Sequence, residues 1–91
     1  MSEHSFNPWR TLKHPHMTEK SVGLIEKENK IVFIVDRKAD KEKIRKAFEQ
    51  AFDVKVEKIN TEITTSGEKK AYIKLKPENK AIDVAVKLGI V

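Results

Sequence analysis

Lysine and tyrosine alternate with apolar residues in the segment KKAYIKLK, residues 69–76. In an extended strand, this alternation separates an apolar face from a polar face that holds Lys70, Tyr72, Lys74 and Lys76. Ammonium groups neutralise phosphates, and a tyrosine ring can stack on a base or a sugar. The pattern is typical of a nucleic-acid-binding strand. Solvent-facing strand positions are also often lysine, because lysine blocks pairing between sheet edges.

The overall charge favours the same class of ligand. The 91-residue chain has 19 Lys and Arg residues against 14 Asp and Glu residues, which gives a net charge of +5. Residues 1–29 carry four basic and four acidic side chains, so the positive excess lies in the last two thirds of the chain. A polyanion is therefore the first candidate partner, and the simpler explanation is a lysine-rich soluble surface.

The stretch HPHMTEKS, residues 14–21, holds the other residue types that could carry chemistry. His14 and His16 would share one face of a strand, but the proline between them distorts it. A third metal ligand at a recognisable spacing is missing, so we expect no metal site. Ser21 lies near His16 in the sequence without an acidic partner or an oxyanion motif. Glu19 stands among basic residues, although a carboxylate would repel phosphate.

Enzymes and membrane proteins fit the composition poorly. The three glycines are scattered, so the chain has no phosphate-binding glycine loop. Cysteine is absent, which fits a reducing compartment, and no apolar run could span a membrane or form a signal-peptide core. We expect a cytoplasmic, non-enzymatic protein without a cofactor. A protein-binding module with a basic surface and a small phosphate-ester hydrolase stay open as alternatives.

Periodicity and turn residues predict seven helices and strands in the order β-α-β-α-β-β-α. The expected segments are a strand at 9–14, a helix at 18–28, a strand at 30–36, a helix within 39–53, strands at 54–64 and 69–76, and a helix at 80–88. This order predicts an α+β fold (an α/β sandwich) with one mostly antiparallel four-stranded sheet and helices packed on it. We expect residues 1–8 to form a flexible tail and residues 9–91 a single domain.

The first half of the chain contains several local signals. Thr18 is expected to cap the first helix with Glu19 in its first turn, and Asn29 to end it. Residues 30–36 contain five consecutive apolar residues, which predicts a central strand covered on both faces. Such a strand implies helices on both sides of the sheet, or a helix on one side and another partner on the other.

The second half contains equally specific signals. The second helix should begin after Asp40 and bury one apolar stripe, while its charged residues face outward. The stripe is Ile44, Ala47, Phe48, Ala51 and Phe52, and the outward residues are Lys41, Glu42, Arg45, Lys46 and Glu49. The strand at 54–64 changes phase, which predicts a bulge near Glu57 and Lys58. The last helix is expected to have Asn79 as its cap, Gly89 as its end, and Ile82, Ala85 and Val86 facing inward.

Three segments together resemble one family. They are KHPHMTEKS at 13–21, NKIVFIVDRKADKEKIRKAFEQAFDVKVEKINT at 29–61 and GEKKAYIKL at 67–75. From about Trp9 to Val91, the chain is similar to the large-subunit ribosomal proteins of the universal L-twenty-three family in their archaeal form. The P-H-x-T-E-K box, the N-K-x-x-F-x-V-D strand and the F-x-V-K-V-E-x-[IV]-N-T strand carry this resemblance.

The resemblance implies a place in the cytoplasmic ribosome. It implies binding to large-subunit rRNA near the exit of the nascent-peptide tunnel and contact with neighbouring large-subunit ribosomal proteins. It also implies a docking surface for factors such as the signal recognition particle, in which Glu19 is exposed. A carboxylate in the first helical turn is favourable in its own right, by ~0.3–1 kcal/mol. Bacterial members carry a long basic extension between the hairpin strands, where this chain has only TTSGEK.

The candidate RNA-binding residues lie at the first strand–helix junction and on the two hairpin strands. They are expected to contact the backbone, 2′-hydroxyls and unpaired bases of folded rRNA, so that residues 9–91 form one rRNA-binding domain. The set is Lys13, His14, Lys20, Lys55, Lys58, Asn60, Lys69, Lys70, Tyr72, Lys74 and Lys76. Glu19 is expected to point away from the rRNA.

Overall fold

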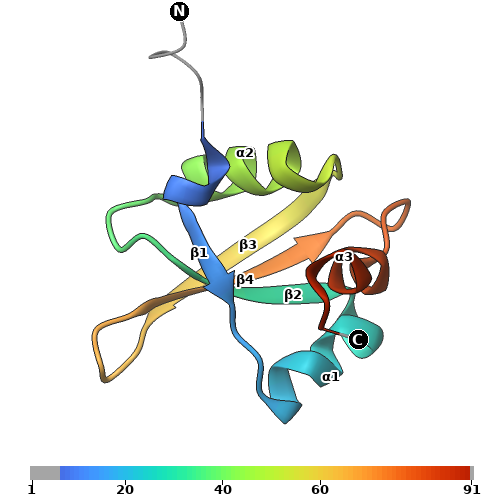
Figure 1. Ribbon diagram of the computed structural model, residues 1–91, viewed down its shortest axis with the longest axis horizontal. Helices are drawn as coiled ribbons and strands as arrows, with labels where there is room; N and C mark the ends of the chain where they lie inside the picture. Colours follow the sequence, from blue (N-terminus) through green and yellow to red (C-terminus); the bar gives the residue numbers. More distant parts are fainter. Residues whose placement is uncertain (1–6, 91) are drawn as a thin grey trace, which may run out of the picture.

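The computed structural model describes residues 7–90, so the expectation for residues 1–6 lies outside the described residues. Its elements follow the predicted order (Figure 1). They are a 3₁₀ turn η2 (Pro8–Arg10), β1 (Leu12–Pro15), α1 (Glu19–Glu28), β2 (Lys30–Val35), α2 (Lys41–Phe52), β3 (Val56–Ile63), β4 (Lys69–Leu75) and α3 (Ala81–Leu88). The α+β class is therefore confirmed.

The four strands form a single antiparallel sheet in the order β1-β2-β4-β3. The strands β2 and β3 lie on opposite sides of β4, so the connection through α2 crosses over β4. The consecutive strands β3 and β4 form the predicted hairpin, whose loop projects away from the helices (Figure 1). The helix α2 runs along one side of the sheet, and α1 and α3 lie next to each other at the lower right of the view (Figure 1).

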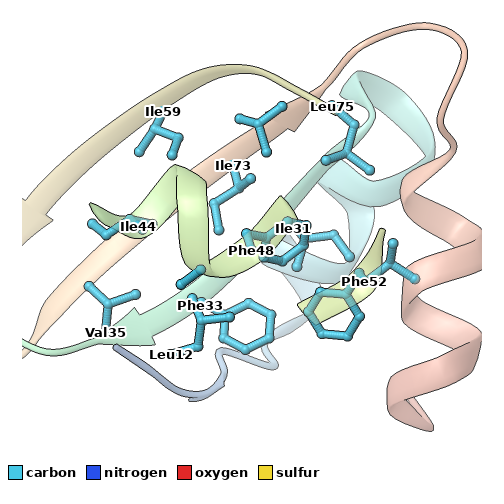
Figure 2. Close-up of a cluster of buried hydrophobic side chains, with 14 of the residues drawn as sticks. Leu12, Ile31, Phe33, Val35, Ile44, Phe48, Phe52, Ile59, Ile73 and Leu75 are labelled. Carbon is cyan, nitrogen blue, oxygen red and sulfur yellow. The ribbon is translucent and has the colours of Figure 1, made fainter. Parts of the chain in front are cut away.

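The hydrophobic core lies on one face of the sheet, and all three helices contribute to it (Figure 2). Three aromatic rings form its centre. The rings of Phe33 and Phe48 meet edge to face at 5.7 Å, and the centroids of Phe48 and Phe52 are 4.8 Å apart. Ile25 and Val84 bring α1 and α3 into the same cluster. Each fully buried side chain of this size contributes about 1.5–3 kcal/mol through the removal of apolar surface from water.

The strand β2 is buried on both faces, as its apolar run predicted. The odd-numbered residues of this run belong to the core, whereas Val32 and Ile34 face the other side and are each 3% exposed. On that side the start of α1 lies over part of the sheet, where Leu24 and Val32 line one cavity. The sheet register places Tyr72 beside Val32, and His14 and Lys70 on either side of Ile34. Side chains of the neighbouring strands, together with the start of α1, therefore cover this face.

The two ends of α1 are as predicted. The backbone N–H of Ser21 donates to Thr18 Oγ1 at 3.1 Å, and the N–H of Thr18 donates to Ser21 Oγ at 2.8 Å, which closes a capping box. Glu19 lies in the first turn, and Asn29 ends the helix with a left-handed φ of 56°. Asparagine tolerates this conformation better than most residues with a side chain.

The first strand begins later than the predicted residue 9. The Asn7 side chain accepts a hydrogen bond from the backbone N–H of Trp9 at 3.0 Å, and Pro8 favours a turn through its fixed φ. Trp9 and Arg10 therefore lie in η2, where the Trp9 ring packs edge to face on Phe52. A tertiary contact thus overrides the extended pattern. The third strand is likewise shorter than predicted, because β3 begins at Val56.

The helix α2 has the predicted cap and apolar stripe, but the prediction that all of its charged residues face outward is wrong for two of them. Asp40 caps it by accepting from the backbone N–H of Lys43 at 2.8 Å. Arg45 and Glu49 are half-buried, because both bind the backbone of Val56. Arg45 donates to its carbonyl at 3.0 Å, and Glu49 accepts from its N–H at 2.8 Å. These bonds fix the start of β3, directly before the predicted bulge between Val56 and Lys58.

Two predictions for α3 are wrong. Asn79 does not cap the helix, because its side chain accepts from the backbone N–H of Lys55 at 2.6 Å. The side chain of Asn29, distant in sequence, accepts from the backbone N–H of Ala81 at 2.7 Å instead. Val86 is 59% exposed, whereas Val84 is buried against the core. The predicted end at Gly89, with φ of 79°, is confirmed.

Candidate nucleic-acid interface

The register of the sheet collects many of the predicted residues on the face opposite the core, here called the open face. Three rows run across the strands, about 7 Å apart along each strand. The first row is Lys30, Lys74 and Lys58; the second is Val32, Tyr72 and Asn60; and the third is His14, Ile34, Lys70 and Glu62. Neighbouring side chains within a row lie about 5 Å apart. The open face thus concentrates lysines around one aromatic ring.

Two acidic residues border these lysines. Lys30 Nζ lies 2.9 Å from Glu28, and Lys70 Nζ lies 3.8 Å from Glu62. The hydrogen bond and charge of Lys30, with the charge of Lys74, lower the pKa of the Glu28 carboxyl. The Glu28 and Glu62 side chains are 50% and 53% exposed, so these surface ion pairs contribute little to stability. A phosphate group can therefore replace either carboxylate as the partner of a lysine at low cost.

The lysines of the open face also act as a cover. The side chains of Lys70 and Lys30 are only 18% and 23% exposed, which indicates that their aliphatic stems lie along the sheet while the ammonium groups reach water. The ammonium group of Lys70 is 5.6 Å from the centre of the Tyr72 ring. This distance permits a cation–π interaction, which holds positive charge beside the ring.

The first strand–helix junction borders the open face. Lys13 is exposed and lies at the irregularity in β1 between Leu12 and His14, so it has no direct partner on β2. His14 is exposed in the third row. Lys20 lies in the first turn of α1 and lines a cavity together with Tyr72. The structure therefore brings this junction next to the hairpin strands.

Three other candidates are placed elsewhere. Lys69 lies on the core side of the sheet, where its ammonium group donates to the carbonyl of Ala39 at 2.6 Å. Lys55 and Lys76 are exposed just outside β3 and β4, joined by a backbone hydrogen bond of 3.0 Å. They extend the basic surface beyond one end of the hairpin. Lys69 instead fastens β4 to the loop that precedes α2.

Sequence reasoning missed Lys30, which shares the first row with Lys58 and Lys74. The available signal is strand alternation, because Lys30 lies two residues before Val32 and therefore shares the face of Val32 and Ile34. The apolar run of β2 hides that signal, because both faces of the strand are buried. Only the pairing of Lys30 with Lys74 reveals the row.

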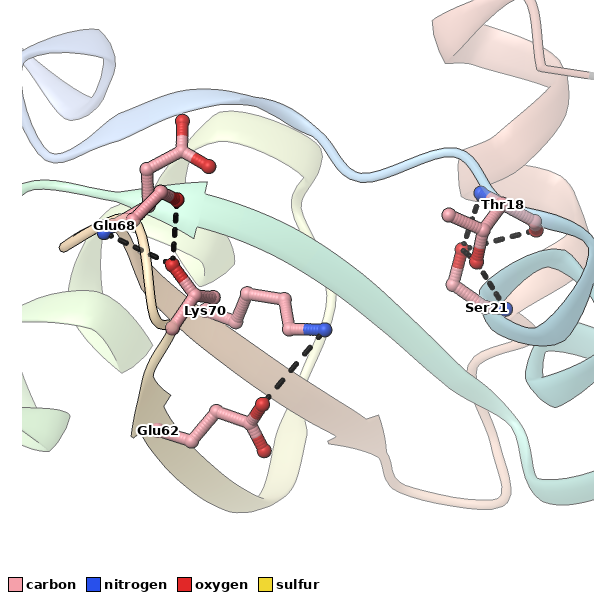
Figure 3. Close-up of polar contacts among 7 residues, drawn as sticks. Thr18, Ser21, Glu62, Glu68 and Lys70 are labelled. Atoms are coloured by element: carbon pink, nitrogen blue, oxygen red, sulfur yellow. Dashed lines mark hydrogen bonds and ion pairs between the residues drawn. The ribbon is translucent and has the colours of Figure 1, made fainter.

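A cavity of about 260 Å³ lies between the open face and the start of α1. Its lining includes Val32 and Tyr72 from the sheet, Leu24 and Lys20 from α1, and Lys70 and Glu62 from the hairpin strands. Figure 3 shows the Lys70–Glu62 pair on the hairpin and the Thr18–Ser21 cap of α1. We call this the Tyr72 cavity.

The remaining chemical candidates have structural roles. The Ser21 hydroxyl donates to the backbone carbonyl of His16 at 2.7 Å rather than to its ring, so these residues do not form a nucleophile–base pair.

Within residues 7–90, no group of three or more His, Asp and Glu side chains is arranged to hold a metal ion. None of the helices in that range is long and apolar enough to cross a membrane.

Glu19 is exposed on a different side of α1 from the Tyr72 cavity. Successive helical residues are about 100° apart around the axis, so Glu19 and the cavity residue Leu24 are about 140° apart. Lys20 and Leu24 are one turn apart and both line the cavity. The first turn of α1 thus directs a lysine toward the open face and a carboxylate away from it.

The fold and the open face define a small basic α+β protein with a cationic sheet surface. Comparison with known proteins identifies its family: the ribosomal protein L23 family matches residues 10–84. The large ribosomal subunit protein uL23 of Methanothermobacter thermautotrophicus is 50% identical over 84 residues, which cover 92% of this chain and 98% of that protein. The uL23 protein of Methanococcus vannielii is 53% identical over 79 residues, covering 87% and 92% respectively.

The chain belongs to the ribosomal protein L23 family. It is therefore a structural, non-enzymatic component of the large ribosomal subunit, and it takes part in translation in the cytoplasm. The resemblance inferred from the three sequence segments is confirmed, including its archaeal character.

Proposed function

We propose that the protein binds large-subunit rRNA through the open face of its sheet and the adjoining first turn of α1. The observation that carries this proposal is the row of Lys30, Lys74 and Lys58, which antiparallel pairing places side by side on three strands. Such a row concentrates three positive charges on one face of the sheet, and lysines clustered on one face are the electrostatic footprint of nucleic-acid binding. The Tyr72 ring in the next row adds a surface on which a base can stack.

Phosphate contacts make a quantitative prediction about salt. About five neutralised phosphates give a log–log slope of the binding constant against salt of roughly −3.5 to −4.5. Replacing Lys74→Gln, in the centre of the row, is expected to reduce the magnitude of this slope by ~0.7–0.9. Filter binding of the full chain to large-subunit rRNA at several salt concentrations measures both quantities.

The matched control is Lys41→Gln, an exposed lysine at the start of α2, away from the open face. It is expected to leave the slope unchanged. A wild-type slope near zero would contradict phosphate-led binding. Equal effects of the two substitutions would mean that the charge of the whole protein, rather than the open face, drives association. A chain that ignores rRNA at low salt would favour the protein-binding module.

We further propose that this domain, residues 9–91, lies near the tunnel exit, contacts neighbouring ribosomal proteins and offers Glu19 to factors such as the signal recognition particle. The family resemblance motivates this proposal, and the position of Glu19 on α1 supports it. With the open face against rRNA, a residue about 140° around the helix from Leu24 is turned away from the phosphates. A carboxylate there stays available to a cationic partner.

Charge reversal of Glu19 tests the docking proposal. Glu19→Lys is expected to leave incorporation into the large subunit intact and to weaken the binding of the signal recognition particle to the assembled subunit. Glu42→Lys is the control, because Glu42 is also an exposed carboxylate in a first helical turn, but on α2. If Glu19→Lys prevented incorporation while the isolated protein stayed folded, Glu19 would belong to the RNA interface.

A further inference from the structure

The Tyr72 cavity has the size and lining of a site for one planar ring. Its volume of about 260 Å³ lies just below the ~300 Å³ at which pockets for drug-sized ligands begin. Leu24 and Val32 supply apolar walls from α1 and β2, and Tyr72 supplies an aromatic surface from β4. A single base fits this combination, because its faces are apolar enough to stack and its edges carry polar groups.

The polar groups at the cavity discriminate between possible ligands. Lys20 and Lys70 come from opposite walls and attract an anion. The α1 terminus is less available, because Thr18 and Ser21 already form the capping box there. Glu62 also lines the cavity, and its carboxylate only accepts hydrogen bonds. A ligand that satisfies all three side chains carries a negative group and, some distance from it, a hydrogen-bond donor.

We propose that the Tyr72 cavity binds one unstacked base of single-stranded RNA that carries an exocyclic amino group, with cytosine preferred over uracil. The ring stacks on Tyr72 and takes the place of the Lys70 ammonium group beside the ring. Its amino group then replaces Lys70 as the partner of Glu62, and the adjoining phosphate pairs with Lys20 or with the released Lys70. The two pyrimidines have nearly the same shape, but cytosine presents an amino group where uracil presents a carbonyl oxygen that the carboxylate repels. This inference rests on the proposed rRNA-binding function and specifies which part of the RNA the site takes.

The test uses the full chain with cytidine 5′-monophosphate, uridine 5′-monophosphate and ribose 5-phosphate as probes. Methyl resonances of Leu24 and Val32 report on the cavity in NMR titrations. We expect saturable shifts with the cytidine nucleotide, about fivefold weaker binding of the uridine nucleotide, and no comparable shifts with ribose 5-phosphate.

Two substitutions of Tyr72 test the stacking contact. Tyr72→Ala is expected to weaken binding of the cytidine nucleotide about tenfold, whereas Tyr72→Phe, which keeps the ring, is expected to retain most of the binding. Glu62→Gln is expected to reduce the preference for cytidine, because an amide can also donate to the carbonyl oxygen of uracil.

The same preparation is assayed for binding to large-subunit rRNA, which separates the two proposals. If rRNA binds with the expected salt slope but the cytidine nucleotide leaves Leu24 and Val32 unshifted, the cavity inference is wrong and the proposed function stands. Equal shifts from ribose 5-phosphate would show a phosphate site without base recognition and would also overturn the inference. Equal affinity for the two nucleotides would refute the role of Glu62. If neither rRNA nor nucleotides bind, both proposals fail.

Discussion

Asn29 joins three elements of the fold, so its replacement makes a demanding test of the structure. Its backbone ends α1 in the left-handed conformation, with φ of 56°. Its side chain donates to the carbonyls of Leu75 at 3.2 Å and Asn79 at 2.9 Å, and accepts from the N–H of Ala81 at 2.7 Å. One amide group therefore ties α1 to the end of β4 and to the start of α3.

The substitution Asn29→Gly separates the backbone from the side chain. Each of the three hydrogen bonds contributes ~0.5–1.5 kcal/mol, and partners left unsatisfied cost more, so we expect the side-chain loss to destabilise the protein by about 2–4 kcal/mol. Glycine adopts a positive φ readily and recovers about 1 kcal/mol of backbone strain. The net expectation is a decrease of about 1–3 kcal/mol in the free energy of unfolding, a large part of the ~5–15 kcal/mol typical of a domain.

The control is Asp53→Gly. Asp53 ends α2 with φ of 55°, nearly the same conformation, but its side chain is exposed to solvent. We expect this substitution to be neutral or to stabilise the protein by up to about 1 kcal/mol. Urea unfolding of both variants measures the difference, which isolates the Asn29 side chain. If the two substitutions changed the free energy of unfolding by the same amount within ~0.5 kcal/mol, the side-chain network would have no energetic role. Faster hydrogen exchange confined to α3 in Asn29→Gly would show that its cap had been lost.

Two further predictions concern carboxylates. Glu49→Ala leaves the backbone N–H of Val56 without its acceptor, so we expect it to lower the free energy of unfolding in urea by about 1–3 kcal/mol. Glu49→Gln keeps an acceptor and is expected to lower it by less. Equal decreases for the two variants would refute this role of Glu49. Lys30→Gln removes the main cause of the lowered pKa of Glu28, so an NMR titration is expected to show this pKa rising toward its ordinary value. A folded-state pKa that is lowered stabilises the protein above the unfolded pKa, and this stabilisation is lost as the pH falls through the folded pKa. The pH dependence of stability over this acidic range is therefore expected to weaken in Lys30→Gln, and an unchanged Glu28 titration would contradict the pairing.

The sequence predicted local features correctly where the residues that determine them are near neighbours in the chain. Thr18 and Asp40 cap helices as predicted, because a side-chain oxygen needs only the backbone N–H three residues ahead. The alternation in β4 correctly separated the buried residues from Lys70, Tyr72 and Lys74. The phase change in β3 located the bulge, because a bulge shifts the alternation by one residue. These patterns also carried the family resemblance.

Predictions failed where a partner distant in sequence decides the outcome. Asn79 has a suitable side chain and position for capping α3, but its side chain accepts from the backbone N–H of Lys55 instead. The side chain of Asn29, 52 residues before Ala81 in the sequence, accepts from the N–H at the start of α3. Trp9 reads as part of a strand, but it lies in a turn that packs its ring on Phe52.

The sequence by itself determined the helices and strands, their order, most of their apolar faces and the family, because these depend on periodicity and on contacts between near neighbours. Beyond the β3–β4 hairpin, only the tertiary structure decided which strands lie side by side and in what register. That register places Lys30 in a row with Lys74 and Lys58, and the packing of α1 against β2 encloses the Tyr72 cavity. The physical reason is that a shift of one residue in strand pairing moves every side chain to the opposite face. The buried faces of β2 and β4 determine the pairing, and the lysines of the open face follow from it.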